Sequence, residues 1–322
     1  MILTEIEARE ISRYSYLYNF SSELRGKTIL ITGSKGIVGS GIIKWLLYEN
    51  KNKGLDCRIV ASTRDVINTP TYIECDDNIT YIKYGNELEE CSNMQIDYIV
   101  HSAAPTSNKV FASQPVESLN VIISGTERIL KLAKILNSKM IYLSSEEVYG
   151  ASCEEKPITE DFVGSINSLS TRSCYPLGKK VAELLCRSYY EEYGVDVRII
   201  RPTVILGLWQ DYDSVKVEAE ILRCIIEKKN LYMLSDGSTK KSIIYSLDAV
   251  SAVLLALTKG NAGEAYNATN PDTFCSVKER AMSTFAEFNP ELSIDFAEVD
   301  NSQRNGYLLG CPVNGSKFRW LF

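Results

Sequence analysis

A glycine-rich run, Thr32-Gly-Ser-Lys-Gly-Ile-Val-Gly39, directly follows the apolar stretch Lys27–Ile31 and constrains the fold more than any other feature of the chain. Glycines at this spacing between a strand and a helix form a turn that can hold a pyrophosphate on backbone N–H groups and the helix N-terminus. Such a loop can also be only a tight connection, but its position between strand and helix favours binding. The predicted dinucleotide contacts are Gly33, Ser34, Lys35, Gly36, Ile37, Val38 and Gly39.

The three glycines have separate predicted tasks in this turn. Gly33 permits the tight bend, Gly36 lets the backbone approach the phosphates, and Gly39 lets the helix pack against the strand.

Apolar runs alternate with helical patterns from Leu24 onward, which indicates an α/β protein with a doubly wound parallel sheet of the Rossmann type. Such sheets bind ligands beyond the carboxyl ends of their strands. The predicted strands are Thr28–Thr32, Arg58–Ser62, Thr80–Lys83, Tyr98–Ala103, Met140–Ser144 and Val197–Ile200. The predicted helices are Gly39–Tyr48, Val121–Leu136, Leu177–Tyr193 and Val215–Lys228.

Three regions are expected along the chain: an N-terminal helical extension over 1–23, a dinucleotide-binding domain over 24–202, and a smaller substrate-binding lobe over 203–322. The lobe is expected to interleave with the domain and to include a strand over Glu264–Ala268. Thr4 and Glu7 form a capping-box pattern that begins a helix running to about Tyr18. The side of this helix expected to pack on the body carries Ile2, Ile6, Ile11, Tyr14 and Leu17.

Composition excludes several classes of protein. The balance of 35 basic against 41 acidic residues, without a basic block, disfavours nucleic-acid binding. Nine cysteines without a Cys-x-x-Cys pair, and a single histidine, predict no metal site and no disulfide scaffold. The charged N-terminus and the lack of an apolar run of about 20 residues predict a soluble, cytoplasmic protein without a membrane partner.

The end of the second strand bears on the choice of cofactor. An enzyme that uses NAD usually places an acidic side chain there to hold the adenosine ribose. This chain has Ser62, Thr63 and Arg64 instead, and these side chains, with Lys35 nearby, suit the 2′-phosphate of NADP. NADP is therefore favoured over NAD, although Arg64 could also only cap a surface turn. Asn86, after the third strand, could hydrogen-bond the adenine or shape a turn.

Tyr175 and Lys179 are the predicted catalytic pair. Tyrosine, with a pKa near 10, is a poor base at neutral pH, and a lysine four residues later on the same helix face can stabilise its phenolate. Lys179 can also hold the nicotinamide ribose. Pro176 indicates that Tyr175 stands at the start of its helix, where it can face a cleft. Tyr212 and Lys216 have the same spacing, but Tyr212 follows a loop and is expected at the surface.

Ser145 is predicted to end the fifth strand at the same sheet edge as the glycine-rich turn. Its hydroxyl can donate to a substrate oxygen that gains negative charge. Glu147 is the candidate second base and Glu146 the weaker one, and all three are candidate substrate contacts. The simpler alternative is that this serine and acidic pair only cap a helix start.

These residues resemble the extended short-chain dehydrogenase/reductase superfamily, in its nucleotide-sugar epimerase/dehydratase group. The run Thr32–Gly39 matches the TGxxGxxG loop of that group, Ser144-Ser-Glu-Glu-Val-Tyr-Gly150 its S-S/T-x-x-VYG strand end, and Tyr175 with Lys179 its YxxxK pair. Asn120 with Gly125-Thr126 and the segment His101-Ser-Ala-Ala104 also match. The resemblance places Ser102, Ala103 and Ala104 beside the cofactor, and Pro202, after the sixth strand, is counted with them.

Within the group, the segment from Arg172 to Glu183 is similar to the tyrosine region of UDP-glucuronate decarboxylases, and Glu147 matches the glutamate of their S-T-S-E-V-Y-G motif. Three features depart from those enzymes. Val204 stands where an asparagine usually contacts substrate, Lys241 stands where they have an arginine, and Ser62–Arg64 replaces their acidic NAD signature. Lys241 is a predicted substrate contact.

The resemblance implies an NAD(P)-dependent enzyme that oxidises the C4 hydroxyl of a nucleotide sugar. Tyr175 removes the proton, Lys179 keeps the tyrosine acidic, Ser145 stabilises the oxyanion, and Glu147 serves the following epimerisation, dehydration or decarboxylation. Two alternatives remain: an NADPH-dependent reductase of a keto-sugar nucleotide or phosphorylated ketose, and a non-catalytic NADP-binding regulatory protein.

The resemblance also implies a homodimer that pairs the helices Val121–Leu136 and Leu177–Tyr193 of two copies. Apolar residues on these helices could equally belong to the core. They are Ile129, Leu132, Leu136, Leu184 and Leu185.

Overall fold

A seven-stranded parallel sheet forms the centre of the protein in the computed structural model, which describes residues 3–66, 76–150, 157–297 and 312–320. Its strand order, β3-β2-β1-β4-β5-β6-β11, reverses direction between β1 and β4. This arrangement confirms the predicted Rossmann-type α/β fold, and the reversal marks the crevice where such sheets bind ligands. The strands are β1 (Thr28–Thr32), β2 (Arg58–Thr63), β3 (Ile79–Lys83), β4 (Tyr98–His101), β5 (Lys139–Leu143), β6 (Val197–Pro202) and β11 (Ala265–Ala268).

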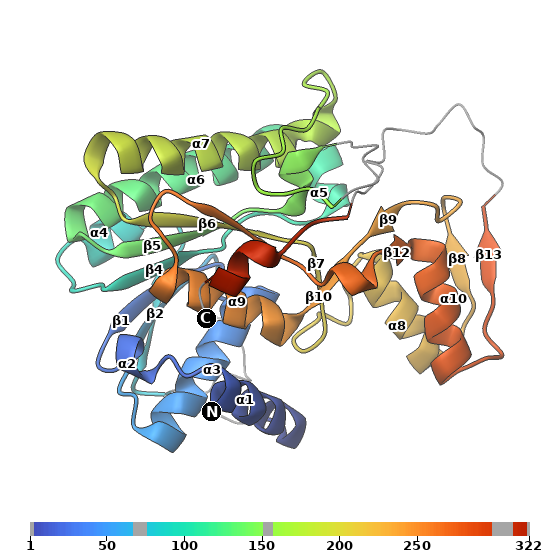
Figure 1. Ribbon diagram of the computed structural model, residues 1–322, viewed down its shortest axis with the longest axis horizontal. Coiled ribbons are helices and arrows are strands. Elements are labelled where there is room, and N and C mark those ends of the chain that lie inside the picture. The colour runs from blue at the N-terminus through green and yellow to red at the C-terminus, as the bar shows by residue number, and fades with distance from the viewer. Residues whose placement is uncertain (1–2, 67–75, 151–156, 298–311, 321–322) are drawn as a thin grey trace.

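Helices cover both faces of the sheet (Figure 1). The helices α6 (Pro115–Leu136) and α7 (Cys174–Tyr193) pack on one face, and α3 (Ile37–Lys53) and α9 (Ser246–Lys259) on the other. Side chains of β1 alternate between the two cores: Ile29 and Ile31 join α3 and α9, while Leu30 joins α6 and α7. This period of two, with both faces apolar, explains why β1 is buried along its whole length.

The predicted strands are all present, but three helices begin earlier than predicted. The helix α3 begins at Ile37, α6 at Pro115 and α7 at Cys174. Proline is tolerated in the first turn of a helix because the N–H that it lacks has no partner there. Pro115 and Pro176 therefore lie inside their helices, and Tyr175 stands in the first turn of α7.

The N-terminal helix α1 (Glu5–Leu17) begins with the predicted capping box, in which Glu7 accepts from the Thr4 N–H at 2.8 Å. The predicted packing side is only partly right. Ile11 is buried, but Ile6 is 57% and Leu17 60% exposed. The buried side instead carries Glu7, Ile11 and Ser15, so polar contacts hold much of this helix. Ile2 lies outside the described residues.

A smaller lobe stands apart from the sheet at the right of Figure 1. It contains α8 (Val217–Glu227), α10 (Val277–Phe288) and the parallel pair β8 (Leu231–Met233) and β13 (Ile294–Phe296). Its own core includes Ile221, Leu231 and Phe285. Between lobe and sheet lie two short pairs, β7 (Val204–Leu206) with β10 (Ile243–Tyr245) and β9 (Lys240–Lys241) with β12 (Cys275–Ser276). The chain returns to the large sheet for α9 and β11 before it enters the lobe again.

A late segment, the 3₁₀ turn Ser316–Trp320, lies along the outermost strand β11. The Lys317 ammonium donates to the Ala265 carbonyl at 2.9 Å, and the Phe318 ring packs 5.5 Å from the Tyr266 ring. This segment therefore covers the edge of the sheet.

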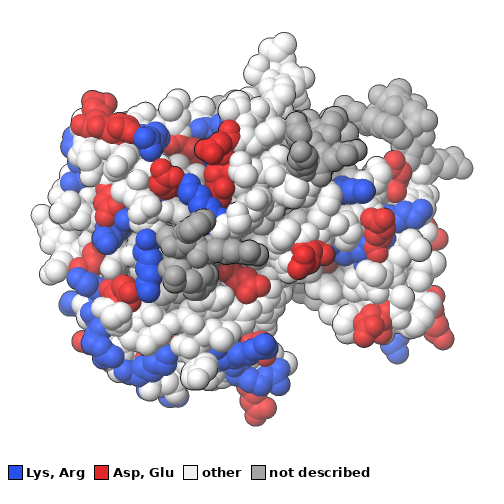
Figure 2. Space-filling model, in the orientation of Figure 1, with Lys and Arg blue, Asp and Glu red and all other residues white. Residues whose placement is uncertain are grey.

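The surface carries no dominant charge on the face shown in Figure 2, where basic and acidic side chains are interspersed. Within the described ranges, none of the helices is both long and apolar enough to cross a lipid bilayer.

His101 is buried at the end of β4 and ties three elements together. The Thr126 hydroxyl of α6 donates its proton to the Ile122 carbonyl at 2.6 Å. The Thr126 oxygen is therefore the acceptor in its hydrogen bond with His101 Nε2, at 3.2 Å. His101 Nδ1 then accepts from the Thr32 hydroxyl of β1 at 2.7 Å. Burial, with the nearby cations Lys179 and Arg128, lowers the pKa of this ring to about 3.

We predict that the His101 ring stays neutral from pH 8 to pH 5. Because its pKa is lowered, the folded protein binds fewer protons here than the unfolded chain below about pH 6.5, and acidification through this range destabilises the fold. The chain has one histidine, so its ring proton NMR signal needs no assignment. The signal should not move in this range in the folded protein but should titrate near 6.5 in urea, and a folded-state midpoint near 6.5 would contradict the prediction.

Candidate active site

The glycine-rich turn joins β1 to α3 through two close backbone approaches. Gly33 has a φ of +70°, and a Cβ there would lie 2.8 Å from the Ala103 nitrogen at the end of β4. A Cβ at Gly39 would lie 2.4 Å from the Gly33 carbonyl oxygen. Only glycine therefore allows the turn to sit against β4 and the helix to sit against the turn.

The N-terminus of α3 suits a pyrophosphate. Its N-cap, Gly36, supplies no side-chain hydrogen bond, and no acidic residue lies in the first turn. The N–H groups of this turn and the partial positive charge of the helix end are thus left for an anion. Lys35 is exposed at the rim, Ile37 half-buried and Val38 buried.

The end of β2 holds a carboxylate that sequence reasoning missed. Ser62 is fully buried, and its hydroxyl donates to Glu87 at 2.6 Å. Glu87 also accepts from the Gly85 N–H at 3.0 Å and from Arg128 Nε at 3.1 Å. The Ser62 carbonyl accepts from the Ser34 hydroxyl at 3.0 Å, which ties this network to the glycine-rich turn. An acidic residue two positions after Gly85 was the available signal.

The other predicted cofactor residues follow the ends of neighbouring strands. Thr63 is buried, Arg64 is exposed just beyond β2, and Asn86 precedes α4 (Glu87–Cys91) without capping it through its side chain. Ser102, half-buried after β4 with Ala103 and Ala104, donates its hydroxyl to the Thr32 carbonyl at 2.7 Å. Pro202 is buried at the end of β6. All of them lie along the carboxyl edge of the sheet, and their contacts with a cofactor remain predictions.

Tyr175 is 8% exposed and stacks on Phe111, with the ring centroids 4.7 Å apart. Burial raises the pKa of its hydroxyl well above the ordinary value, and the negative charge of Glu147 adds to this. The side chain of Ser145 acts in the opposite direction and lowers this pKa. With this raised pKa, the Tyr175 phenol is protonated at neutral pH and can act as an acid.

Lys179 is 2% exposed and lies one turn along α7 from Tyr175. Its ammonium donates to the Leu143 carbonyl at the end of β5 and lies 4.7 Å from the Tyr142 ring centroid and 5.9 Å from that of Tyr175. Burial lowers the pKa of this amine to about 7, against the opposing charge of Glu183. The amine is therefore partly deprotonated at neutral pH.

Ser145 has two contacts at once. It is the N-cap of the 3₁₀ turn Glu146–Tyr149 and accepts from the Glu147 N–H at 3.2 Å, as the simpler interpretation expected. Its side chain also lies near Tyr175, where it lowers the pKa of the tyrosine hydroxyl. The cap holds the serine at the place where it meets the tyrosine.

The two glutamates after Ser145 have different surroundings. Glu147 accepts two hydrogen bonds from Arg172 Nη2, at 2.9 and 3.2 Å. Lys241 Nζ lies 4.0 Å from a carboxylate oxygen of each glutamate. Burial raises the pKa of Glu146 to about 7 in spite of Lys241. Glu147 is thus held by an arginine, while Glu146 can exchange a proton near neutral pH.

On the lobe side, Lys241 was predicted from the sequence, but Arg280, which comes from a distant segment, was not. Arg280 of α10 donates to the Lys241 carbonyl at 2.6 Å and lies 3.9 Å from Glu218. Among the described residues, several buried polar atoms here have no hydrogen-bond partner, which favours a polar ligand. They are Ser144 Oγ, Arg172 Nη1, Ser242 Oγ and Arg280 Nη1.

Tyr212 and Lys216 do not repeat the pair in α7. Tyr212 is 48% exposed, and its hydroxyl donates to Glu227 at 2.7 Å. Lys216 is half-buried near Glu218 and Lys241, and burial lowers the pKa of its amine. The tyrosine therefore lies at the surface, as expected.

Residues 29–269 match the model of the NAD dependent epimerase/dehydratase family. A curated relative, UDP-glucuronic acid decarboxylase 6 of Arabidopsis thaliana, is 28% identical over 279 residues, which cover 87% of this chain and 78% of the relative.

Solved structures of low sequence identity share the fold. A dTDP-glucose 4,6-dehydratase of Bacillus anthracis, solved in complex with NAD, has a TM-score of 0.74 and 22% identity over 92% of this chain and 90% of its own. A UDP-N-acetylglucosamine 4-epimerase of Methanobrevibacter ruminantium M1 has a TM-score of 0.76 and 20% identity over 92% of each chain.

Gly33→Ala tests the approach between the turn and β4, with Gly26→Ala as the matched control. Both glycines have φ near +70°, but a Cβ at Gly26 meets nothing within 4 Å. We expect the control to lose about 1 kcal/mol of unfolding free energy and Gly33→Ala about 2 kcal/mol more, because its methyl group overlaps the Ala103 backbone. Only Gly33→Ala should also weaken NAD binding in calorimetry. Equal losses in the two variants would show that the contact does not matter.

Glu146 should make the stability of the protein fall as the pH rises. Its folded-state pKa of about 7 lies above the ordinary value of 4.5, so between these values the folded protein binds the extra proton and each increase in pH favours unfolding. In urea titrations from pH 4.5 to 7.5, the wild type should lose about 3 kcal/mol more than Glu146→Gln, which has no such proton. Parallel pH profiles would show that burial does not hold the proton.

Proposed function

This chain belongs to the NAD dependent epimerase/dehydratase family, and we propose that it modifies a nucleotide sugar by transient oxidation of the sugar C4 hydroxyl. The observation that carries the proposal is the convergence of Tyr175, Ser145 and Lys179 at the carboxyl edge of the sheet. Ser145 lies near Tyr175 and lowers the pKa of its hydroxyl, and Lys179 contacts both the end of β5 and the tyrosine ring. The names of the relatives, which act on UDP- and dTDP-linked sugars, support a substrate of this class.

Proton transfer at C4 is assigned to Tyr175. In its phenolate form, Tyr175 takes the hydroxyl proton as the ketone forms and returns that proton when the alcohol is restored. A bound nicotinamide supplies the acceptor for the hydride that leaves C4. Ser145 donates to the substrate oxygen, and the protonated fraction of Lys179 stabilises the phenolate.

The second stage is assigned to Glu146 rather than to Glu147, which was the first choice from sequence. A ketone at C4 acidifies the neighbouring C–H, and a group with a pKa of about 7 can both accept and donate that proton at neutral pH. Glu147, paired with Arg172, orients the arginine and Lys241.

Glu146 also stands at the position where the decarboxylase motif has a serine. Its charge repels a uronate, which favours epimerisation or dehydration of a neutral sugar.

The choice between NAD and NADP depends on the end of β2. The family is NAD dependent, and the buried Glu87 places a negative charge beside Ser62. Arg64, exposed next to it, favours a 2′-phosphate. The proposal therefore includes either dinucleotide, and native mass spectrometry of the purified protein identifies the one that it retains.

A reductase that consumes NADPH is the second candidate, acting on a keto-sugar nucleotide or a phosphorylated ketose. The protonated state of Tyr175 and the exposed Arg64 favour it, because reduction needs a proton donor and an NADPH site. The fate of the dinucleotide separates the two candidates: a reductase consumes one NADPH per product, whereas an epimerase or dehydratase keeps its cofactor through turnover.

We predict that Tyr175→Phe lowers kcat on the nucleotide sugar at least about 100-fold while NAD still binds, because only the proton-transferring oxygen is lost. Glu146→Gln should instead stop product formation while C4 oxidation, seen as NADH absorbance in a single turnover, persists. Tyr16→Phe removes the hydroxyl of a tyrosine that is 88% exposed on α1 and serves as the control. Wild-type turnover in Tyr175→Phe would refute the assignment. Absence of any turnover in the wild type would favour the non-catalytic alternative.

A homodimer through α6 and α7 is part of the proposal. The residues Ile129 and Leu132 belong to the core, but Leu184 is 65% and Ile135 61% exposed on the outer side of these helices. Apolar side chains at such positions favour burial by a second copy. We predict that sedimentation equilibrium gives a dimer for the wild type and a monomer for Leu184→Glu. A wild-type monomer would contradict this prediction.

A further inference from the structure

Helix α1 lies outside the sheet and its catalytic edge, yet its buried side contacts two segments that lead to the smaller lobe. The first is the loop 207–216, which runs from β7 to α8. The second is the end of β10, which follows the strand that carries Lys241. In Figure 1, α1 lies below α9 and beside the lower part of α3.

Trp209 is the contact point in the loop. Its φ of +66° is a left-handed backbone conformation that is strained for a residue with a Cβ. The ring occupies a space that exists only because residue 41 of α3 is glycine: a Cβ there would lie 2.4 Å from Trp209 Cζ3. A strained residue seated so closely is held by its surroundings, and α1 provides part of them.

Glu7 of α1 holds this tryptophan. Its carboxylate accepts from Trp209 Nε1 at 2.8 Å, pairs with Lys44 of α3, and accepts the Thr4 N–H at 2.8 Å. Both Glu7 and Lys44 are buried. These donors fix the buried carboxylate in place. Removal of one partner of a buried ion pair strongly destabilises a fold, because the other charge is left buried without compensation.

Tyr14 makes the second contact. Its hydroxyl donates to Asp248 of α9 at 2.7 Å, and its ring lies 6.2 Å from that of Tyr245. The Tyr245 ring in turn closes on Gly207, where a Cβ would lie 2.5 Å from it. Tyr245 thus packs against the start of the loop.

The far end of the same loop lies near the charged side chains of the candidate site. Lys216 follows Trp209 by seven residues, and the charges of Glu218, Lys241 and Glu147 act on its amine. The next residue begins α8, which carries Glu218. A shift of the loop would therefore move the lobe-side charges relative to the acidic pair on the sheet.

We propose that α1 is a brace for the loop 207–216, with Glu7 and Trp209 as positioning residues that set the place of the lobe for nucleotide-sugar binding. The binding role rests on the proposed function, whereas the mechanical role does not. The brace joins the loop to α3, the helix whose N-terminus forms the dinucleotide cradle.

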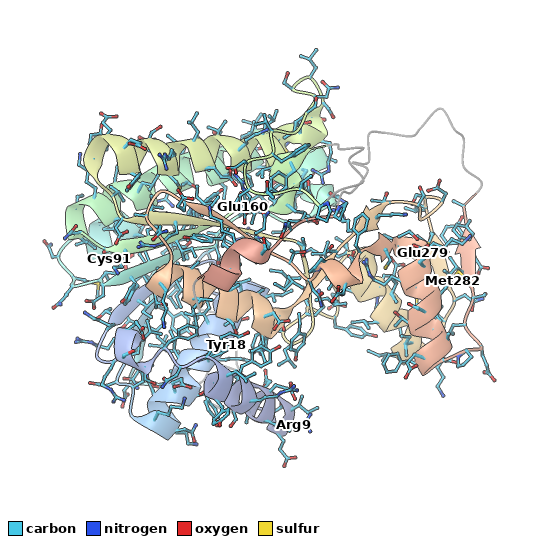
Figure 3. All side chains as sticks on the ribbon, viewed as in Figure 1. Arg9, Tyr18, Cys91, Glu160, Glu279 and Met282 are labelled. Atoms are coloured by element: carbon cyan, nitrogen blue, oxygen red, sulfur yellow. The ribbon has the colours of Figure 1, made fainter. Side chains whose placement is uncertain are left out.

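The variants Trp209→Phe and Glu7→Gln test the brace. The first keeps an aromatic ring but removes the N–H donor, and the second keeps an oxygen but removes the charge that pairs with Lys44. Arg9→Ala is the matched control on the same helix, because Arg9 is 74% exposed and points away from the body in Figure 3.

Hydrogen–deuterium exchange measures the mechanical role without any substrate. We expect about tenfold faster exchange over 207–216 and α8 in both variants, with α6 and α7 unchanged, because one anchoring contact is lost locally. The control should match the wild type. Unchanged exchange over 207–216, or equal acceleration in every segment, overturns the brace.

Calorimetry with UDP-glucose and, separately, with NAD measures the binding role. We expect the two variants to weaken UDP-glucose binding about tenfold and to leave NAD binding unchanged. Equal UDP-glucose affinity in wild type and variants, together with faster loop exchange, overturns the positioning role. A wild type that binds no nucleotide sugar counts against the proposed function, and the exchange result still decides the brace.

Discussion

The contact between Gly33 and the backbone of Ala103 is the constraint on which the candidate site depends. It joins the glycine-rich turn to the end of β4, on the two sides of the point where the strand order reverses. Next to this contact along the chain, His101 links Thr32 of β1 to Thr126 of α6. The turn is therefore fixed both by close backbone packing and by buried hydrogen bonds. Residues that follow β4 and β5 then meet the same crevice.

Local patterns were sufficient to predict the sheet, the glycine-rich turn and the placement of Tyr175 and Lys179 one turn apart on a helix, because strand periodicity, glycine spacing and helical spacing act over a few residues. Contacts between distant segments could not be predicted in this way. Glu87 beside Ser62, Arg172 on Glu147, and Glu7 on Trp209 join residues 25, 25 and 202 positions apart. The exposed Ile6 and Leu17 show the same limit, since buried polar contacts rather than apolar periodicity determine how α1 packs.

Burial brings an acid and a base in the candidate site to similar proton affinities. Removing a carboxyl from water disfavours its anion and raises the pKa of Glu146 to about 7, while removing an amine disfavours its cation and lowers the pKa of Lys179 to about 7. A single physical cause thus gives two groups that exchange protons near neutrality. The lobe contributes to this balance because Lys241, which opposes the shift at Glu146, belongs to the strand pair that connects lobe and sheet.

The segment Ser316–Trp320 along β11 has a consequence for how molecules of this protein behave at high concentration. An uncovered outer strand presents a row of free peptide groups that can recruit a strand from another molecule and begin aggregation. Lys317 occupies one of these carbonyls, on Ala265, and Phe318 closes over Tyr266. The last part of the described chain thereby shields the sheet from intermolecular strand addition.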